Sequence, residues 1–121
     1  MKRVTLNLNE LQRYFGMWLK SNPFDIGITT QNALFVIKLK KLDPLESYEN
    51  TILGTSKSLS NGCLMRATPL AVWGHKLNKE ELYQSVKLQT MFTHSHETAV
   101  ITTYLYCYAI GLLINSTEEA V

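Results

Sequence analysis

The feature that most constrains this chain is a polar, turn-prone segment that passes without a spacer into apolar residues at helical spacing. The polar part runs from Thr55 to Gly62 and ends in Asn61-Gly62, a pair that tolerates positive φ and is typical of turns. The residues that follow at helical spacing are Cys63, Leu64, Met65, Ala67, Leu70, Ala71 and Trp73. They predict one helix that runs to about Gly74 and buries one face.

This loop and helix allow two interpretations. Free backbone N–H groups at the start of a helix, together with the positive end of its dipole, suit an anion such as a phosphate. The simpler interpretation is a loop that leads into a core helix.

The composition is typical of one globular domain. The chain has 121 residues, of which 45% are hydrophobic and 18% are charged, so it is long enough to bury a core of its own. Its net charge is +2, and no basic stripe with interleaved aromatic residues argues for nucleic acid as a partner. The group Lys38, Lys40 and Lys41 is interpreted as the solvated end of a helix. Cys63 and Cys107 lie among apolar residues and are expected to be reduced core thiols of a cytoplasmic protein.

The run from Ala99 to Ile114 is the candidate membrane segment. It is shorter than the roughly 20 residues that a span needs, and it contains polar threonines and tyrosines. We therefore expect a buried helix and no membrane association. No apolar run follows Met1-Lys2-Arg3, so a signal peptide is not expected.

Capping residues and prolines divide the chain into short helices. The expected caps are Asn7 with Glu10, Thr29 or Thr30, Asp43 before Pro44, and Asn78 with Glu81. The expected breaks are Ser21-Asn22-Pro23 and Gly54. The apolar set of the second helix is Ala33, Leu34, Ile37 and Leu39. Short loops between about five helices predict an all-α fold, an orthogonal or antiparallel helical bundle.

Three blocks of the sequence carry a resemblance to a known family. The first is Ser60-Asn61-Gly62, followed by Met65-Arg66 and Pro69-Leu70, and the second is Thr93-His94. The third lies upstream and reads Trp18…Ser21…Pro23-Phe24-Asp25-Ile26-Gly27…Thr29-Thr30…Ala33-Leu34. In order and rough spacing these blocks resemble the Asn-Gly…Met-Arg…Pro-Leu signature, the Thr-His pair and the preceding segment of the ADP-ribosylglycohydrolase family.

The resemblance implies an all-helical hydrolase that removes ADP-ribose from modified proteins, or from related conjugates, with a pair of magnesium ions. It also implies that the loop from Ser56 to Gly62 and the Thr-His pair line the cleft for ADP-ribose. The substrate-binding residues expected on this basis are Lys57, Ser58, Ser60, Asn61, Gly62 and His94. The expected partner is ADP-ribose or an ADP-ribosylated protein.

The chain departs from the family pattern at the metal ligands. Its only aspartates are Asp25 and Asp43, and neither belongs to the Thr-Asp-Asp or Asp-x-Asp-Thr type of motif that holds the family's metals. No catalytic or metal-binding residue is therefore assigned. We expect residues 1–121 to be part of a family domain whose N- and C-terminal metal motifs are absent. A capping box from Ser116 to Glu119 with no helix after it agrees with a fragment.

Two functions remain open at this point. One is an inactive fragment of an ADP-ribosyl-protein hydrolase, and the other is a non-catalytic helical module that binds ADP-ribose or a protein partner. Asp25 suits a turn as well as a metal, and Arg66 is first interpreted as a structural residue that binds carbonyls or pairs with an acid.

The segment Thr93 to Glu97 invites a metal interpretation because it contains two histidines and a glutamate. Side chains two residues apart point to different sides of a helix, which argues against zinc. Without the resemblance, His94 would be interpreted as a structural histidine. Antiparallel helices on either side of Asn78 would bring His94 close to Asn61. We therefore predict that these two residues lie near each other.

Overall fold

The computed structural model describes residues 6–120, with side chains described as far as Ser116, and every regular element in this part of the chain is a helix. The helices are α1 (Leu8–Lys20), α2 (Ile28–Lys40), α3 (Pro44–Thr55), α4 (Gly62–Met65), α5 (Thr68–Trp73), α6 (Lys79–Thr90) and α7 (Glu97–Ala120). The predicted all-α fold is confirmed, although the helices are more numerous than predicted.

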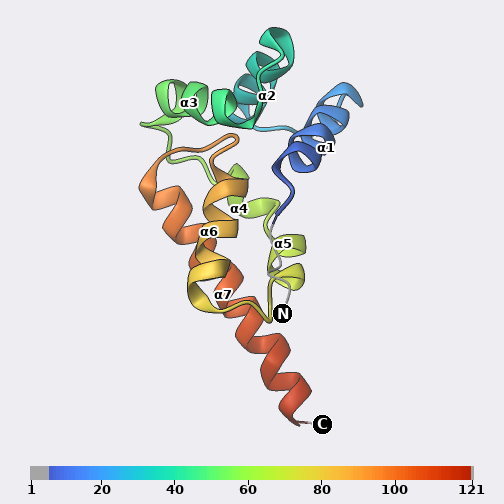
Figure 1. The fold of residues 1–121 in the computed structure, drawn as a ribbon, viewed down its shortest axis with the longest axis vertical. Coiled ribbons are helices and arrows are strands. Elements are labelled where there is room, and N and C mark those ends of the chain that lie inside the picture. Colours follow the sequence, from blue (N-terminus) through green and yellow to red (C-terminus); the bar gives the residue numbers. More distant parts are fainter. Residues whose placement is uncertain (1–5, 121) are drawn as a thin grey trace.

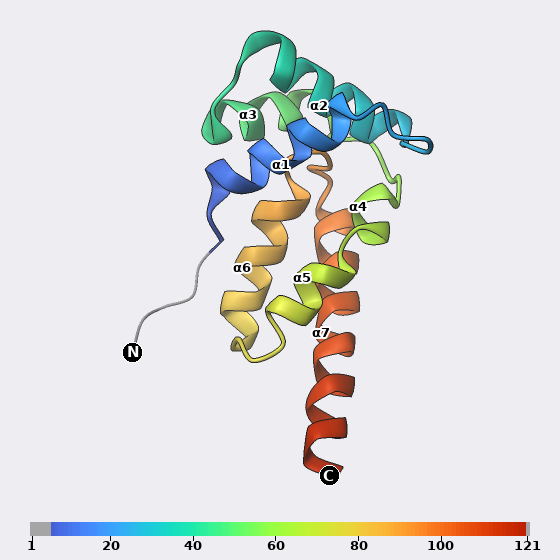
Figure 2. The same ribbon diagram turned by 90° about the vertical axis from the view of Figure 1, so that its right-hand side faces the viewer.

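The helices form two layers that cross (Figure 1). In the first layer, α1, α2 and α3 pack against one another, and in the second layer α5 and α6 pack along α7. Figure 2 shows α1 and α2 running across the direction of α7. The short helix α4 joins the layers because it contacts both α2 and α7.

Each layer has its own apolar core. The core of the second layer is formed by Ala67, Leu70, Ala71, Leu82, Val86 and Cys107, and that of the first by Leu34, Ile37 and Phe92. Phe92 comes from the turn between α6 and α7, and its fully buried ring lies 4.7 Å from Tyr48 and 5.8 Å from Phe15 between ring centroids. This aromatic contact fixes the α6–α7 turn against the first layer.

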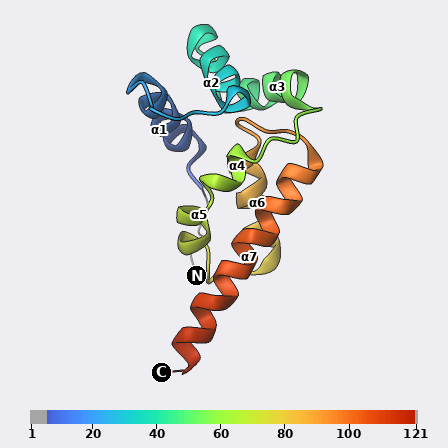
Figure 3. The same ribbon diagram turned by 180° about the vertical axis from the view of Figure 1, so that it is seen from behind.

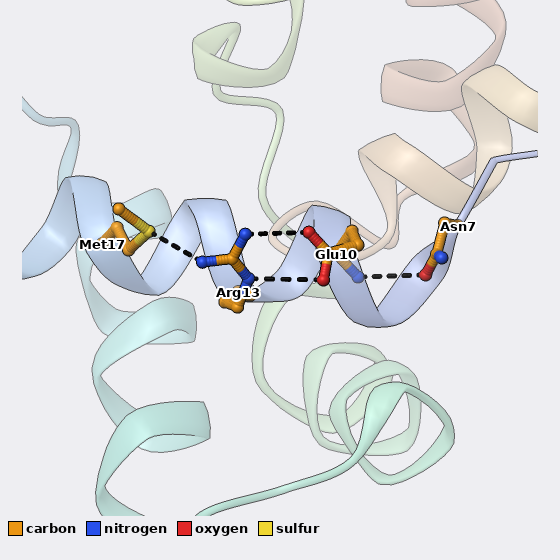
Figure 4. A network of polar contacts seen from close by, with 4 residues as sticks. All are labelled: Asn7, Glu10, Arg13 and Met17. Atoms are coloured by element: carbon orange, nitrogen blue, oxygen red, sulfur yellow. Dashed lines mark hydrogen bonds and ion pairs between the residues drawn. The ribbon is translucent and has the colours of Figure 1, made fainter.

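The cap predicted for α1 is confirmed for the side chain of Asn7 but not for that of Glu10 (Figure 4). The Asn7 Oδ1 accepts a hydrogen bond from the Glu10 backbone N–H at 3.1 Å. The Glu10 carboxylate does not complete a capping box, because it accepts two hydrogen bonds from the Arg13 guanidinium one turn later. The helix ends at Lys20 before Pro23, as predicted.

The caps of α3 and α6 lie where the sequence predicted them. Asp43 and Glu46 form a complete capping box at the start of α3, and Pro44 occupies its first turn. Asn78 accepts a hydrogen bond from the Glu81 backbone N–H at 2.8 Å and caps α6. The predicted threonine cap of α2 is wrong, because α2 begins at Ile28 after Gly27, which has no side chain to cap it.

The single helix predicted from Cys63 to about Gly74 is also wrong. The structure has two short helices, α4 and α5, separated at Arg66 and Ala67. Pro69 explains the break, because a proline lacks the N–H for the i−4 bond and its ring collides with the carbonyl of Met65. The buried positions of the predicted face are Cys63, Ala67, Leu70 and Ala71, whereas Met65 is 75% exposed.

Helix α7 is less buried than the sequence suggested. It is long and apolar enough to cross a membrane by length and composition, and 28% of its most apolar window is buried. Figure 3 shows its C-terminal end extending beyond α5 and α6. No new helix begins at Ser116, since α7 continues through this residue to Ala120. Both cysteines are buried and free, as predicted.

Candidate functional site

The loop between α3 and α4 is held by its own serine side chains. The Ser58 hydroxyl lies 3.0 Å from the Thr29 hydroxyl of α2 and accepts a hydrogen bond from the Ser60 N–H at 3.3 Å. The Ser60 hydroxyl in turn accepts from the Gly62 N–H at 3.4 Å. The loop is therefore fixed to the start of α2 through Thr29.

His94 lies directly behind this loop. Its side chain is fully buried, with Nδ1 2.6 Å from the Thr93 hydroxyl and Nε2 3.4 Å from the Ser60 hydroxyl. The prediction that His94 returns to the loop that carries Asn61 is confirmed by this contact with the neighbouring residue. Desolvation, and after it the positive charge of Arg66, lowers the pKa of His94 to about 4. The imidazole is therefore neutral at neutral pH, with one nitrogen as donor and the other as acceptor.

Hydroxyl groups of α3 hold the turn that carries His94. The Thr51 hydroxyl donates to the Phe92 carbonyl at 3.0 Å, and the Ser95 N–H donates to the Thr55 hydroxyl at 3.1 Å. The Ser95 hydroxyl donates to the Thr51 carbonyl at 3.2 Å. These contacts, one buried and two partly buried, fix the backbone on both sides of His94.

Gly62 is required by close packing. A Cβ at this position would lie 3.0 Å from the Thr30 hydroxyl of α2 and 3.5 Å from Cε1 of His94. Thr30 is itself buried, so it has little room to move. The glycine therefore lets the loop, α2 and His94 meet at one point.

An open pocket of about 320 Å³ lies on the outer side of this meeting point. It is lined by Trp18, Asp25, Ile26, Gly27, Thr30, Ser60, Asn61, Gly62, Met65 and Arg66. The first five residues belong to the upstream block and the others to the block that contains Asn61-Gly62. His94, from the third block, supports the wall from behind through Ser60. The fold thus brings together three segments that are far apart in the sequence.

Arg66 has a structural role and also lines the pocket. Its Nε donates to Gln89 Oε1 at 2.7 Å, its Nη2 donates to the Gln89 carbonyl at 3.1 Å, and its guanidinium lies 4.7 Å from the Phe15 ring centroid. This agrees with the predicted carbonyl-binding role. Desolvation lowers its pKa to about 10, which still leaves the group charged at neutral pH. Arg66 therefore contributes positive charge beside the pocket.

The predicted site residues do not all reach this pocket. Ser60, Asn61 and Gly62 line it, Ser58 supports the loop through the Ser60 N–H, and His94 lies behind it. Lys57 is exposed and does not line the pocket. The role of each in ligand binding stays a prediction.

The phosphate site that the sequence suggested at a helix N-terminus does not fit the geometry. Helix α4 has four residues, so few peptide dipoles add up at its start. The N–H groups of Ser60 and Gly62 also have partners, the hydroxyls of Ser58 and Ser60. An anion in this pocket would be held mainly by side chains and by the charge of Arg66.

The pocket was harder to predict than the loop. The sequence predicts Thr30 as a helix cap and gives Trp18 no role of its own, although both belong to the upstream block of the resemblance. That block was the signal that could have assigned them to the site.

The residues present do not fit a magnesium pair. Among the described residues, Asp25 is the one carboxylate that lines the pocket, and Asp43 is used by the capping box of α3. Between residues 6 and 120, no three His, Cys, Asp or Glu side chains of the described part lie close enough together to hold a metal ion. Magnesium requires a hard oxygen shell that these side chains do not supply.

Comparison with known protein families gives a match over almost the whole chain. The family model described as ADP-ribosylglycohydrolase matches residues 2–121. A search of curated proteins and a search of solved structures gave no significant match. The matched range contains all three sequence blocks and every residue that lines the pocket.

Proposed function

Since this chain belongs to the ADP-ribosylglycohydrolase family of hydrolases, we propose that its pocket binds ADP-ribose, either free or attached to a protein. The observation that supports this most strongly is the convergence of the three blocks. The upstream block and the Asn61-Gly62 block line one pocket, and His94 of the third block contacts Ser60 in its wall.

The chemistry of the lining suits a ribose diphosphate. Asn61 is exposed in the pocket and can donate and accept hydrogen bonds with ribose hydroxyls. The guanidinium charge of Arg66 favours a diphosphate nearby. Trp18 and Met65 offer apolar surface for a flat ring. A neutral His94 does not add a second positive charge, so it acts by holding Ser60.

We further propose that this chain alone binds ADP-ribose without hydrolysing it. Cleavage of a glycosidic bond needs two carboxylates or a metal site that orients and activates water. Asp25 is a single carboxylate, and the described side chains do not fit the magnesium pair implied by the family. The acidic ligands would have to come from elsewhere for turnover to occur.

A non-catalytic module that binds a protein partner is the second candidate. The same shortage of carboxylates favours it, because binding requires no metal or general acid. The two candidates differ in one property, since only the first predicts ADP-ribose in the pocket.

Calorimetric titration of the purified chain with ADP-ribose tests the proposal. We expect measurable binding that Asn61→Ala weakens about tenfold through the loss of hydrogen bonds. Asn32→Ala is the matched control, because Asn32 is exposed on α2 and does not line this pocket. Absence of heat with the wild-type chain, or equal effects of both substitutions, would exclude ADP-ribose from this pocket.

A parallel assay tests turnover. The chain is incubated with magnesium and an ADP-ribosylated protein, and a full-length family hydrolase serves as positive control. We expect no release of ADP-ribose above the blank. Release that Asp25→Asn abolishes would mean that the catalytic groups do lie in this chain.

A further inference from the structure

A second cavity of about 350 Å³ lies between α1 and the second half of α2. Its floor is aliphatic and includes the buried side chains of Leu34 and Ile37. Its rim carries the cationic side chains of Arg13, Lys38 and Lys41. We call this cavity the basic groove. It shares no lining residue with the proposed ADP-ribose pocket, so a ligand of the basic groove is independent of ADP-ribose binding.

The basic groove keeps a positive charge even when the ion pair between Arg13 and Glu10 is taken into account. Arg13 is neutralised by Glu10, with Nη2 2.8 Å from Oε2, and its Nη1 contacts the Met17 sulfur (Figure 4). Lys38 and Lys41 are exposed, and within the described part of the chain neither has an ion-pair partner. None of the described residues that line the groove is a carboxylate.

Lys41 occupies a backbone position that favours another residue. It caps the C-terminus of α2 with φ 52° and ψ 48°, in the left-handed region. Glycine or asparagine is the usual residue there, and a side chain such as lysine costs roughly 1 kcal/mol. A lysine at this position is unfavourable for the fold, yet it supplies charge at the rim of the groove.

Gly16 is similarly unfavourable for α1. It lies within the helix, where glycine is roughly 0.5–1 kcal/mol worse than alanine. Apart from its chain neighbours and the backbone of α1 itself, no described atom lies within 4 Å of the Cβ that a larger residue would have there, so packing does not require glycine. The groove is therefore left open at Gly16 by a residue that costs helix stability.

We propose that the basic groove binds an acidic peptide segment that carries an apolar side chain. Carboxylates of the peptide pair with Lys38 and Lys41, and the apolar side chain contacts the aliphatic floor. A nucleic acid fits less well, because no aromatic side chain of the described residues lines the groove for base stacking and the free cations are few for a phosphate backbone.

Fluorescence anisotropy of a labelled peptide in which glutamate and leucine alternate tests this inference. We expect binding that falls with added salt, and that is lost when lysine replaces the glutamates or serine replaces the leucines. Lys38→Glu with Lys41→Glu should weaken binding at least about tenfold. Lys76→Glu with Lys87→Glu is the matched control, since both lysines are exposed outside the groove, and it should leave binding nearly unchanged.

Gly16 provides a second variant that does not risk unfolding. Gly16→Leu places a side chain in the open groove and should block the peptide, whereas Gly16→Ala should not. Both should unfold at or above the wild-type temperature, because each improves helix propensity.

Four results would overturn the proposal. One is equal binding of the acidic and lysine peptides, and another is binding that survives both the charge reversal and Gly16→Leu. The third is tighter binding of inorganic polyphosphate or single-stranded DNA, which would identify a phosphate-recognising surface instead. Self-association in light scattering that Gly16→Leu abolishes would assign the groove to a second copy of the chain. That result would also contradict the proposal that the groove binds an acidic peptide.

Discussion

Acidification should destabilise this protein through His94. The pKa of its buried imidazole is lowered to about 4 in the folded state, whereas an unfolded histidine titrates near 6.5, about the usual value. Between these two values the unfolded chain binds a proton that the folded chain does not. The free energy of unfolding therefore rises with pH in this window. The contribution of His94 to it is fully present above pH about 6.5 and is lost as the pH drops toward 4.

The size of the effect follows from the shift. Between pH 7 and pH 5, linkage with these two pKa values gives a loss of about 2 kcal/mol. The wall that contains Ser60 borders an open pocket, where solvent screens part of the interaction, so we expect roughly 1–2 kcal/mol. This is a large share of the stability of a small domain.

Urea denaturation at several pH values measures the effect in the wild type and in His94→Gln. The variant keeps hydrogen-bonding groups but cannot be protonated in this range, so its stability should change less between pH 7 and pH 5. The other histidines are common to both proteins, and the difference between the two curves therefore isolates His94. Should His94→Gln fail to fold, the His94 ring can be titrated by NMR in the wild type. Parallel curves, or a ring that titrates near its unfolded pKa, would refute the reasoning.

Three further substitutions test the packing. Gly62→Ala should destabilise by about 1–2 kcal/mol in urea denaturation, because its Cβ would lie 3.0 Å from the Thr30 hydroxyl; an unchanged midpoint would mean that Thr30 has room to move. Arg66→Lys should cost about 1–3 kcal/mol in the same assay, since lysine cannot make both hydrogen bonds to Gln89. Asp43→Ala should cost about 1 kcal/mol through loss of the α3 cap, and hydrogen exchange should rise first at the start of α3 if the cap is responsible.

Local sequence chemistry predicted several helix ends because the relevant contacts are local. Asp43 and Asn78 cap their helices through backbone groups three residues away, and the sequence states both partners. The break between α4 and α5 likewise has a local cause, which is Pro69. The apolar spacing around it suggested one continuous helix, but the missing N–H and the ring collision prevail over that spacing.

The position of His94 was predictable from topology, whereas the contacts that fix it were not. The return of the chain after Asn78 brings His94 to the loop. Thr51, Thr55 and Ser95 then hold it through hydroxyl bonds across the two layers. Buried threonines in a helix have no periodic sequence signature that separates them from surface threonines, so this network needed the structure.

The basic groove was not predicted at all. The lysines at the end of α2 were interpreted as a solvated helix end, which their exposure agrees with. The left-handed conformation of Lys41 and the open space above Gly16 depend on how α1 lies against α2. Neither property follows from the residue types alone.

We propose that the loop before α4 and the start of α2 form one binding pocket for ADP-ribose. An NMR titration of the isotope-labelled chain with ADP-ribose tests it directly. We predict that the backbone amides of Gly27, Ser60, Asn61 and Gly62 shift together, with the same saturation, because these residues line one cavity. No shifts at these four amides, or shifts confined to the basic groove, would contradict the account.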